Sequence, residues 1–326
     1  MGPPDAAPDP APRFVSARGI LDREAVACRP RGAGPASARS DTVRMIYFAY
    51  DATINGDWVS HYAVRLAAHL PDRALCAVHV NDGHVPQADL EERLHLLEDR
   101  CRMALVGLQT EVHPRGHSVL ETLQRVVPPG PSNYLVCGTR VSPRRRGFIS
   151  GTVAERLLQA RRQPVLAVRV VQPGLLGAPH DLLVPVAGVP GGLDSALPWL
   201  ALFAPDVQAL QFLYVEEVGR RRFRHLSFDQ AQALRRAGTA YLHRVEAQAR
   251  RALELPEAHV DTHVVVSDDV PKEIVIQANR FKSHLICLGA SARNRGQRFM
   301  YGDPIEQVLA NAPCDVAVYQ GVSVDA

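Results

Sequence analysis

The sequence predicts an α/β protein that consists of two five-stranded parallel-sheet domains in tandem. The chain has 326 residues, which exceeds one ordinary hydrophobic core and fits two domains of about 140 residues. Short runs of Val, Ile and Leu alternate with helix-periodic segments, as in parallel sheets that helices cover on both faces. A pair of glycines 13 residues apart, Gly138 and Gly151, recurs 151 positions later as Gly289 and Gly302.

The composition is that of an ordinary globular protein. Hydrophobic residues make up 46% and charged residues 22% of the chain, and the formal net charge is +3. So small a net charge gives no reason to expect a nucleic-acid or membrane partner. The six cysteines form no C-x-x-C pair, which favours buried thiols in a reducing compartment. We therefore expect a cytoplasmic protein.

The domain boundaries follow from the places where periodicity stops. Residues 1–44 contain seven prolines and no sustained period, so they are expected to form a disordered tail. Met45 would also make a natural start, which leaves open whether that tail is translated. The predicted plan is then a first domain, a Pro- and Gly-containing linker, a second domain and a short tail, at residues 45–171, 172–180, 181–320 and 321–326.

In the first domain, apolar runs predict five strands with helices between them. A helical period from Trp58 to Leu70 follows the first strand. The strands are predicted at Ile46–Tyr50, Leu75–Val80, Glu111–His113, Tyr134–Cys137 and Val165–Val170. The later helices are predicted at Leu90–Leu108, Val119–Val127 and Thr152–Ala160.

The second domain repeats this order. Its strands are predicted at Leu182–Val186, Ala209–Val215, His263–Val266, Leu285–Leu288 and Val316–Tyr319. The offset between the halves is 136 residues at the first strand and 151 at the last, so about 15 residues are inserted after the second strand. Units of this kind bind ligands at the carboxyl ends of strands where the strand order reverses, and both glycine pairs begin at such an end.

The stretch that starts at Gly138, GTRVSPRRRGFISGTVAERLLQARRQPVLAVRV, resembles the carboxyl-terminal signature of the universal stress protein family. In that family the pattern is Gly, two residues, Gly, nine residues, Gly, then Ser or Thr. Gly138, Gly151 and Thr152 match it, and Val141 stands at the second glycine. The resemblance covers about residues 45–320. It implies an adenine nucleotide alpha hydrolase-like fold for both domains.

The resemblance also implies binding residues. Asp51 and Val80, in a His79-Val80 pair, match the family positions beside the adenine. The ribose and phosphates would meet the residues of the signature, which are Gly138, Val141, Gly151, Thr152 and Val153. A helix start with free N–H groups suits a phosphate. Purely structural interpretations stay open: Thr152 and Glu155 form a capping box, and an aspartate after a strand is often a turn residue.

The second copy departs further from the pattern. Ala292 replaces the second glycine, Asp303 replaces the Ser or Thr, and Ala187 stands where the family has aspartate. As a helix N-cap, Asp303 would accept the N–H donors itself and repel a phosphate, and Pro304 removes one donor. ATP, or another adenine nucleotide, is therefore expected in the first domain only, with no other cofactor.

Two function classes remain open. One is a stress-response regulatory protein that senses an adenine nucleotide. The other is a nucleotide-free module that docks on a regulatory protein partner. No P-loop, G-x-S-x-G or H-E-x-x-H motif is present, so a slow ATPase is the most that the sequence allows. The resemblance implies antiparallel pairing of the two last strands, an intramolecular pseudo-dimer, and leaves a homodimer open.

Overall fold

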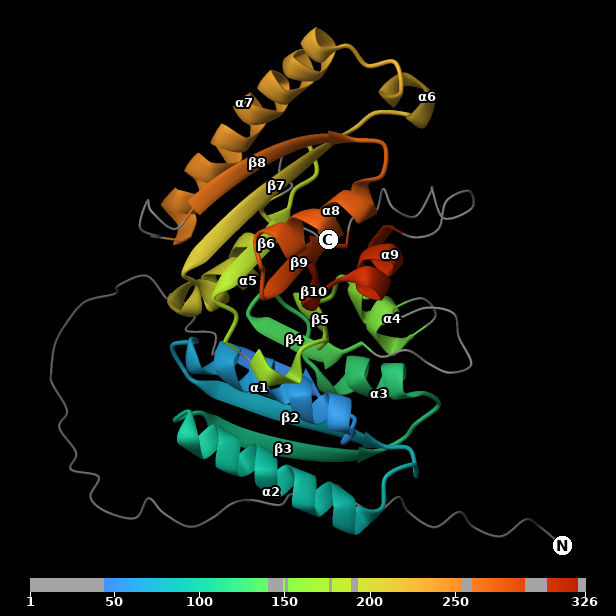
Figure 1. The fold of residues 1–326 in the computed structure, drawn as a ribbon. Coiled ribbons are helices and arrows are strands. Elements are labelled where there is room, and N and C mark those ends of the chain that lie inside the picture. Colours follow the sequence, from blue (N-terminus) through green and yellow to red (C-terminus); the bar gives the residue numbers. More distant parts are fainter. Residues whose placement is uncertain are drawn as a thin grey trace, which may run out of the picture.

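A computed structural model describes residues 44–139, 149, 152–175, 178–188, 193–253, 260–290 and 304–321 (Figure 1). The predicted tail at residues 1–44 lies outside this part of the chain except for Arg44, and the tail from residue 322 on lies outside it too. No helix within the described part is both long and apolar enough to span a membrane.

Five strands and four helices lie in the described residues of the first half. Its strands are β1 (Met45–Ala49), β2 (Ala74–Asn81), β3 (Gly107–Pro114), β4 (Asn133–Gly138) and β5 (Val165–Arg169). Its helices are α1 (Ile54–Ala68), α2 (Gln87–Met103), α3 (Val119–Val126) and α4 (Val153–Ala160). The strands are parallel and lie in the order β3-β2-β1-β4-β5, so the order reverses between β1 and β4.

The second half repeats this arrangement. Its strands are β6 (Asp181–Pro185), β7 (Ala209–Glu217), β8 (Val260–Ser267), β9 (Leu285–Gly289) and β10 (Asp315–Gln320). Its helices are α5 (Leu197–Phe203), α6 (Arg220–Phe223), α7 (Phe228–Leu253), α8 (Val270–Arg280) and α9 (Pro304–Asn311). Short 3-10 turns lie at Pro173–Leu175 and Ala204–Asp206. The α6–α7 segment lies in the insertion that the sequence indicated after the second strand.

The two halves join into one mixed sheet of ten strands, in the order β3-β2-β1-β4-β5-β10-β9-β6-β7-β8. The prediction of two five-stranded parallel units is confirmed, but they share a single sheet. The joint is the antiparallel pair of last strands, in which Val316 pairs with Arg169 and Gln320 with Val165. Figure 1 shows this pair at the centre, with β3 and β8 at the two ends.

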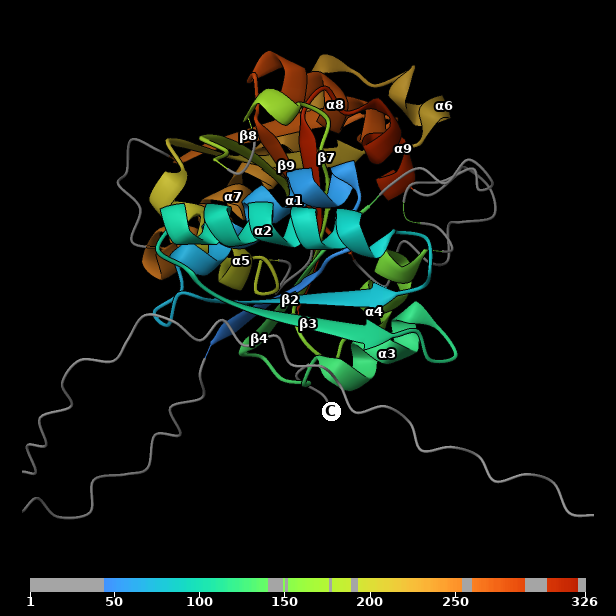
Figure 2. The ribbon, with the colours of Figure 1, turned by 90° about the horizontal axis from the view of Figure 1, so that it is seen from below.

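Helices cover both faces of the sheet because its strands are apolar on both sides. Ile46 and Phe48 of β1 belong to one buried cluster, and Tyr47 packs against the other. The first cluster includes buried residues of α1, α2, α5 and α7, and the second includes those of α3, α4, α8 and α9. Figure 2 shows α2 on one side of β2 and β3 and α3 on the other.

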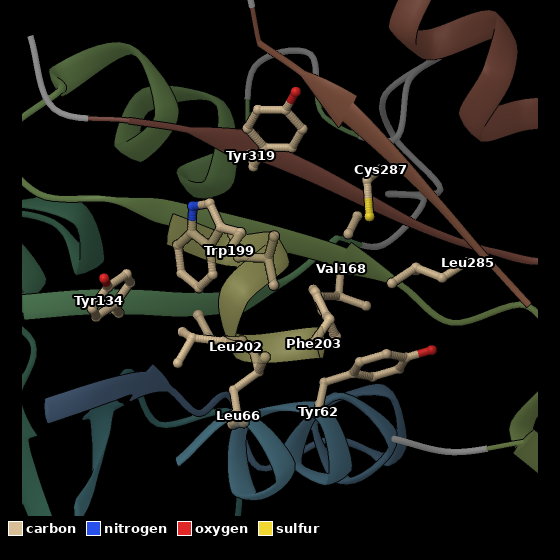
Figure 3. Packing of buried hydrophobic residues seen from close by; sticks show 14 of the residues in the cluster. Tyr62, Leu66, Tyr134, Val168, Trp199, Leu202, Phe203, Leu285, Cys287 and Tyr319 are labelled. Atoms are coloured by element: carbon tan, nitrogen blue, oxygen red, sulfur yellow. The ribbon is translucent and has the colours of Figure 1, made fainter. Parts of the chain in front are cut away.

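The halves also share a hydrophobic core. Trp199 of α5 packs edge-on against Tyr134 of β4, with ring centroids 5.1 Å apart. Figure 3 shows these two rings with Phe203 of α5 and Leu66 of α1 in the same cluster. Since these residues come from both halves, neither half buries its apolar surface independently of the other.

Two predicted boundaries in the first half are wrong. The helix predicted at Leu90–Leu108 ends at Met103, and the strand predicted at Glu111–His113 begins at Gly107. Leu105 has a φ of 56°, in the left-handed region, and Val106 N–H donates to the carbonyl of Cys101 at 2.9 Å. The chain therefore turns at Leu105, although Val106 and Leu108 continue the helical spacing of apolar residues.

Five of the six cysteines lie in the described part of the chain, and all five are buried free thiols. They are Cys76, Cys101, Cys137, Cys287 and Cys314. Burial raises the pKa of each to about 12, so they are poor nucleophiles at neutral pH.

Candidate functional site

A crevice of about 770 Å³ lies at the carboxyl ends of β1, β2 and β4, where the strand order reverses. Residues from β1 and the turn after it, from β2 and the loop after it, from the end of β4 and from the starts of α3 and α4 form its walls. Five of the seven binding residues predicted from the sequence line it: Asp51, Val80, Gly138, Thr152 and Val153. The other two, Val141 and Gly151, lie outside the described residues.

Asp51 lies at the edge of the crevice as part of a turn. Its Oδ1 accepts hydrogen bonds from the Thr53 hydroxyl at 2.7 Å and from the Thr53 N–H at 3.1 Å. Thr53 in turn caps α1 by accepting from the N–H of Gly56 at 3.2 Å. The turn thus holds an exposed carboxylate at the crevice edge, where it can accept hydrogen bonds from hydroxyl or amino groups.

The main chain of Val80 faces the crevice beyond the end of β1. Tyr50 N–H donates to the carbonyl of Val78 at 3.0 Å, and Arg115 N–H donates to that of Asn81 at 3.1 Å. Because alternate residues of a parallel strand turn their peptide groups to opposite sides, those of Val80 point past the end of β1. His79 is buried, and its Nδ1 lies 2.9 Å from the Tyr50 carbonyl, which ties the two strand ends together.

Gly138 ends β4 at the floor of the crevice. A Cβ at this position would lie 2.8 Å from Nδ2 of Asn55 and 3.4 Å from Cγ2 of Val59, both in α1. The packing of α1 is therefore close at this position, although the Asn55 side chain that makes the nearest contact could move. The next residue, Thr139, donates its N–H to the Val168 carbonyl at 2.8 Å, and its buried hydroxyl has no hydrogen-bond partner among the described residues.

Thr152 and Val153 bring the start of α4 into the crevice wall. The Thr152 hydroxyl oxygen accepts from the N–H of Glu155 at 3.2 Å, which is one half of the predicted capping box, while the N–H of Thr152 donates to the carbonyl of Ile149 at 3.0 Å. The same hydroxyl donates to the carbonyl of Ile149 at 2.5 Å. The positive end of the α4 dipole therefore lies at one end of the crevice, and the Asp51 carboxylate lies at another part of its wall.

The sequence analysis missed the loop between β2 and α2 and also missed Thr139. Asp82 and His84 line the crevice, and His84 Nδ1 lies 3.0 Å from Asp82 Oδ1. Burial alone would raise the pKa of Asp82, but the hydrogen bonds from His84 outweigh burial and lower this pKa overall. The available signal was their position: these residues follow the His79-Val80 strand end, and Thr139 follows Gly138.

A network of polar side chains joins α1 to α2 behind the crevice. Tyr50, which lines the crevice, donates its hydroxyl proton to Asp57 at 2.5 Å, and Asp57 also pairs with Arg93. One turn further along α1, Arg100 donates to the Ser60 hydroxyl at 2.5 Å. The strand end at Tyr50 is thus fixed by a carboxylate that α2 holds in place.

We expect His61 in this network to make the protein less stable in mild acid. Burial, and secondarily Arg100, lower its pKa to about 4, with Asp57 opposing them. Between about pH 6.5 and pH 4 the unfolded chain therefore binds the additional proton, so the free energy of unfolding falls as the pH falls. For a fully buried histidine, this loss in the free energy of unfolding would be about 3 kcal/mol. His61 is only partly buried, so solvent screening reduces the expected loss to about 1 kcal/mol.

Urea denaturation at pH 7.5 and pH 5 measures this change. A His61→Gln variant should lose less stability on acidification than the wild type. His95→Gln, at an exposed position of α2, should behave as the wild type does. Equal acid sensitivity of wild type and His61→Gln would show that His61 is not responsible.

Two tyrosines pack at the corresponding strand end in the second half. By sheet register, Ala187 corresponds to Asp51 and Tyr214 to His79. The hydroxyl of Tyr241, from α7, donates to the Ala187 carbonyl at 2.6 Å, and the two tyrosine rings lie 5.3 Å apart. A Cβ on Gly188 would lie 2.9 Å from the Tyr214 ring. Aromatic side chains thus pack against the end of β6.

Three further residues of the second copy, Ala292, Gly302 and Asp303, lie outside the described residues, so the idea of a blocking carboxylate stays a prediction. The tyrosine packing is a difference between the two strand ends that does not depend on those residues.

Comparisons with known proteins agree with this architecture. Residues 180–320 match the model of the Universal stress protein family. No curated protein matches the sequence. A universal stress protein from Archaeoglobus fulgidus has 16% identity and a TM-score of 0.56, over 87% of this chain and 98% of that one. The cytoplasmic domain of a prokaryotic cation chloride cotransporter has 13% identity and a TM-score of 0.51, over 85% and 95%.

A universal stress protein solved in complex with cAMP covers only 44% of this chain and is itself covered over 98%, with 14% identity and a TM-score of 0.32. That likeness is too distant to carry its ligand over to this chain.

The fold and the crevice define a tandem α/β protein with a cavity at one strand-order reversal. Residues 180–320 are similar in sequence to the universal stress protein family, and both halves share the fold of tandem universal stress proteins. The sequence match falls on the half whose glycine signature departs further from the pattern, whereas the crevice lies in the other half.

Proposed function

We propose that this protein is a regulatory stress protein that senses an adenine nucleotide through the crevice of its first half. The main support for the proposal is that the predicted residues meet in one place. Residues predicted separately from four segments, at the ends of β1, β2 and β4 and at the start of α4, line one cavity. Its volume of about 770 Å³ lies within the range of small-molecule sites, and its position is the usual one for such sheets.

The chemistry of the walls suits the parts of ATP. The free main-chain groups of Val80 can pair with the edge of a base, and the Asp51 carboxylate can accept hydrogen bonds from its amino group or from ribose hydroxyls. Phosphates would lie at the start of α4, where the helix dipole favours an anion. In the second half, Tyr241 and Tyr214 pack at the corresponding strand end and Ala187 replaces the aspartate, so one nucleotide per chain is proposed.

Calorimetric titration of the full chain with ATP tests the proposal. We expect one site per chain. Asp51→Ala should weaken ATP binding about tenfold, because the carboxylate loses its hydrogen bonds to the ligand. Asp99→Ala, an exposed position on α2, is the matched control and should bind as the wild type does.

Absence of heat at millimolar ATP would contradict the proposal and favour the nucleotide-free docking module. Mass analysis of small molecules released from freshly purified protein provides a second measurement. An adenine nucleotide in that extract, absent from an Asp51→Ala preparation, would support the sensing function.

A further inference from the structure

A residue of the second half contacts the turn that leads into α4 of the first half. Oε1 of Glu306, in the first turn of α9, accepts the main-chain N–H of Ile149 at 2.7 Å. Ile149 is buried and belongs to the same hydrophobic cluster as Leu157 of α4 and Val308 of α9. The two residues are 157 positions apart in the sequence. The contact therefore fixes part of one half by means of the other.

The carbonyl of Ile149 holds the first residue of the crevice wall on α4. It accepts both the N–H of Thr152 at 3.0 Å and the Thr152 hydroxyl at 2.5 Å. Thr152 then caps α4 through the N–H of Glu155. A continuous set of hydrogen bonds thus runs from the Glu306 carboxylate through Ile149 to the start of α4. Hydrogen bonds to a carboxylate are short and strong, so Glu306 is a firm anchor.

Glu306 does not line the crevice, whereas Thr152 does. Its effect on a ligand would therefore pass through the placement of Thr152 and of the helix start rather than through contact. Its negative charge by itself would disfavour an anion nearby. The positioning of Thr152 by Glu306 would thus favour anion binding, whereas the charge of Glu306 would oppose it. A neutral side chain at position 306 that keeps the acceptor oxygen can separate the two effects.

We propose that Glu306 is a positioning residue by which the second half completes the phosphate end of the first-half site. The inference rests on the proposed nucleotide-sensing function. It assigns the second half a role in ligand binding without a ligand of its own. By thermodynamic reciprocity, a nucleotide that favours the positioned turn also strengthens the contact between α4 and α9.

The experiment compares ATP with adenosine, which lacks phosphates, on the full chain. In Glu306→Ala, affinity for ATP should fall about tenfold, while that for adenosine should change less than about twofold. Glu306→Gln keeps an acceptor oxygen and should return ATP affinity to within about threefold of wild type. Arg65→Ala breaks a different contact between the halves, the ion pair with Asp206, and should leave both affinities unchanged.

Hydrogen exchange of the ligand-free protein gives a second readout. Amides at residues 152–157 should exchange faster in Glu306→Ala than in the wild type or Arg65→Ala. If the alanine variant does not fold, Glu306→Met, which keeps the length of the side chain, takes its place.

Three outcomes would overturn the inference while leaving the nucleotide function intact. They are unchanged ATP affinity in Glu306→Ala, equal losses for ATP and adenosine, and a Glu306→Gln variant as weak as the alanine variant. Unchanged exchange at residues 152–157 would also overturn it. A wild type that binds neither ligand would instead refute the proposed function, and this inference with it.

Discussion

Replacing Asp315 with alanine is expected to lower the free energy of unfolding by about 3–5 kcal/mol, because it removes a buried carboxylate from its hydrogen-bond donors. Asp315 is only 2% exposed at the start of β10. Its Oδ2 accepts from the Tyr62 hydroxyl at 2.6 Å, and its Oδ1 accepts from the N–H groups of Val171 at 2.7 Å and Gln172 at 3.0 Å.

The size of the effect follows from what the substitution leaves behind. The buried Tyr62 hydroxyl would lose its acceptor, and water cannot easily replace it. Half-buried Arg169, which pairs with Val316 across the joint, would lose a nearby negative charge. Tyr62 lies in α1 of the first half, and Val171 and Gln172 follow its last strand. One side chain therefore joins β10 to three groups of the other half.

Urea denaturation followed by circular dichroism measures the change. Tyr62→Phe removes only one of the three donors and should cost about 1 kcal/mol, which makes it the matched control. An Asp315→Ala protein within about 1 kcal/mol of the wild type would show that the carboxylate does not hold the joint.

Much of the fold could be predicted from local sequence because both faces of the sheet are buried. Strands such as β4 and β9 are continuous apolar runs, and their positions agree with the prediction to within one residue. The error at Leu105 has a physical cause. Apolar spacing reports which side of an element is buried, but a turn with positive φ depends on the backbone of one residue.

Part of the candidate site could likewise be predicted from local sequence, and part could not. Asp51, Val80, Gly138 and Thr152 could be predicted because each follows a strand or begins a helix, and parallel strand ends meet at one edge. The contact between Glu306 and Ile149 could not, since it spans 157 positions and nothing in the sequence around either residue points to the other. Long-range pairs of this kind depend on how the two halves pack.

The tyrosines of the second half are a similar case. Tyr214 lies in a strand and Tyr241 in a long helix, and each residue reads locally as part of an ordinary apolar face. Only the packing of α7 on β7 and β8 brings their rings together beside Ala187. The prediction that the second half lacks a nucleotide rested on Ala187, Ala292, Asp303 and Pro304, and the structure adds the tyrosine packing beside Ala187.

That packing depends on Gly238, and Gly238→Val is expected to lower the free energy of unfolding by about 3 kcal/mol through overpacking. Gly238 is a buried position of α7. A Cβ there would lie 2.7 Å from Cγ1 of Val264 and 2.8 Å from Cδ1 of Tyr214, closer than side chains tolerate. Valine has a better helix propensity than glycine, but that gain of about 0.5 kcal/mol is too small to offset the collision.

Gly219→Val is the matched control, because a Cβ on Gly219 would have nothing within 4 Å, and it should change stability by less than about 0.5 kcal/mol. Urea denaturation of both variants measures their stabilities. Similar midpoints would show that α7 shifts to accommodate the valine with no loss of stability. The ATP affinity of folded Gly238→Val should equal that of the wild type, since α7 does not line the first-half crevice. A loss of ATP affinity there would mean that the end of β6, where the tyrosines pack, and the open crevice are coupled rather than independent.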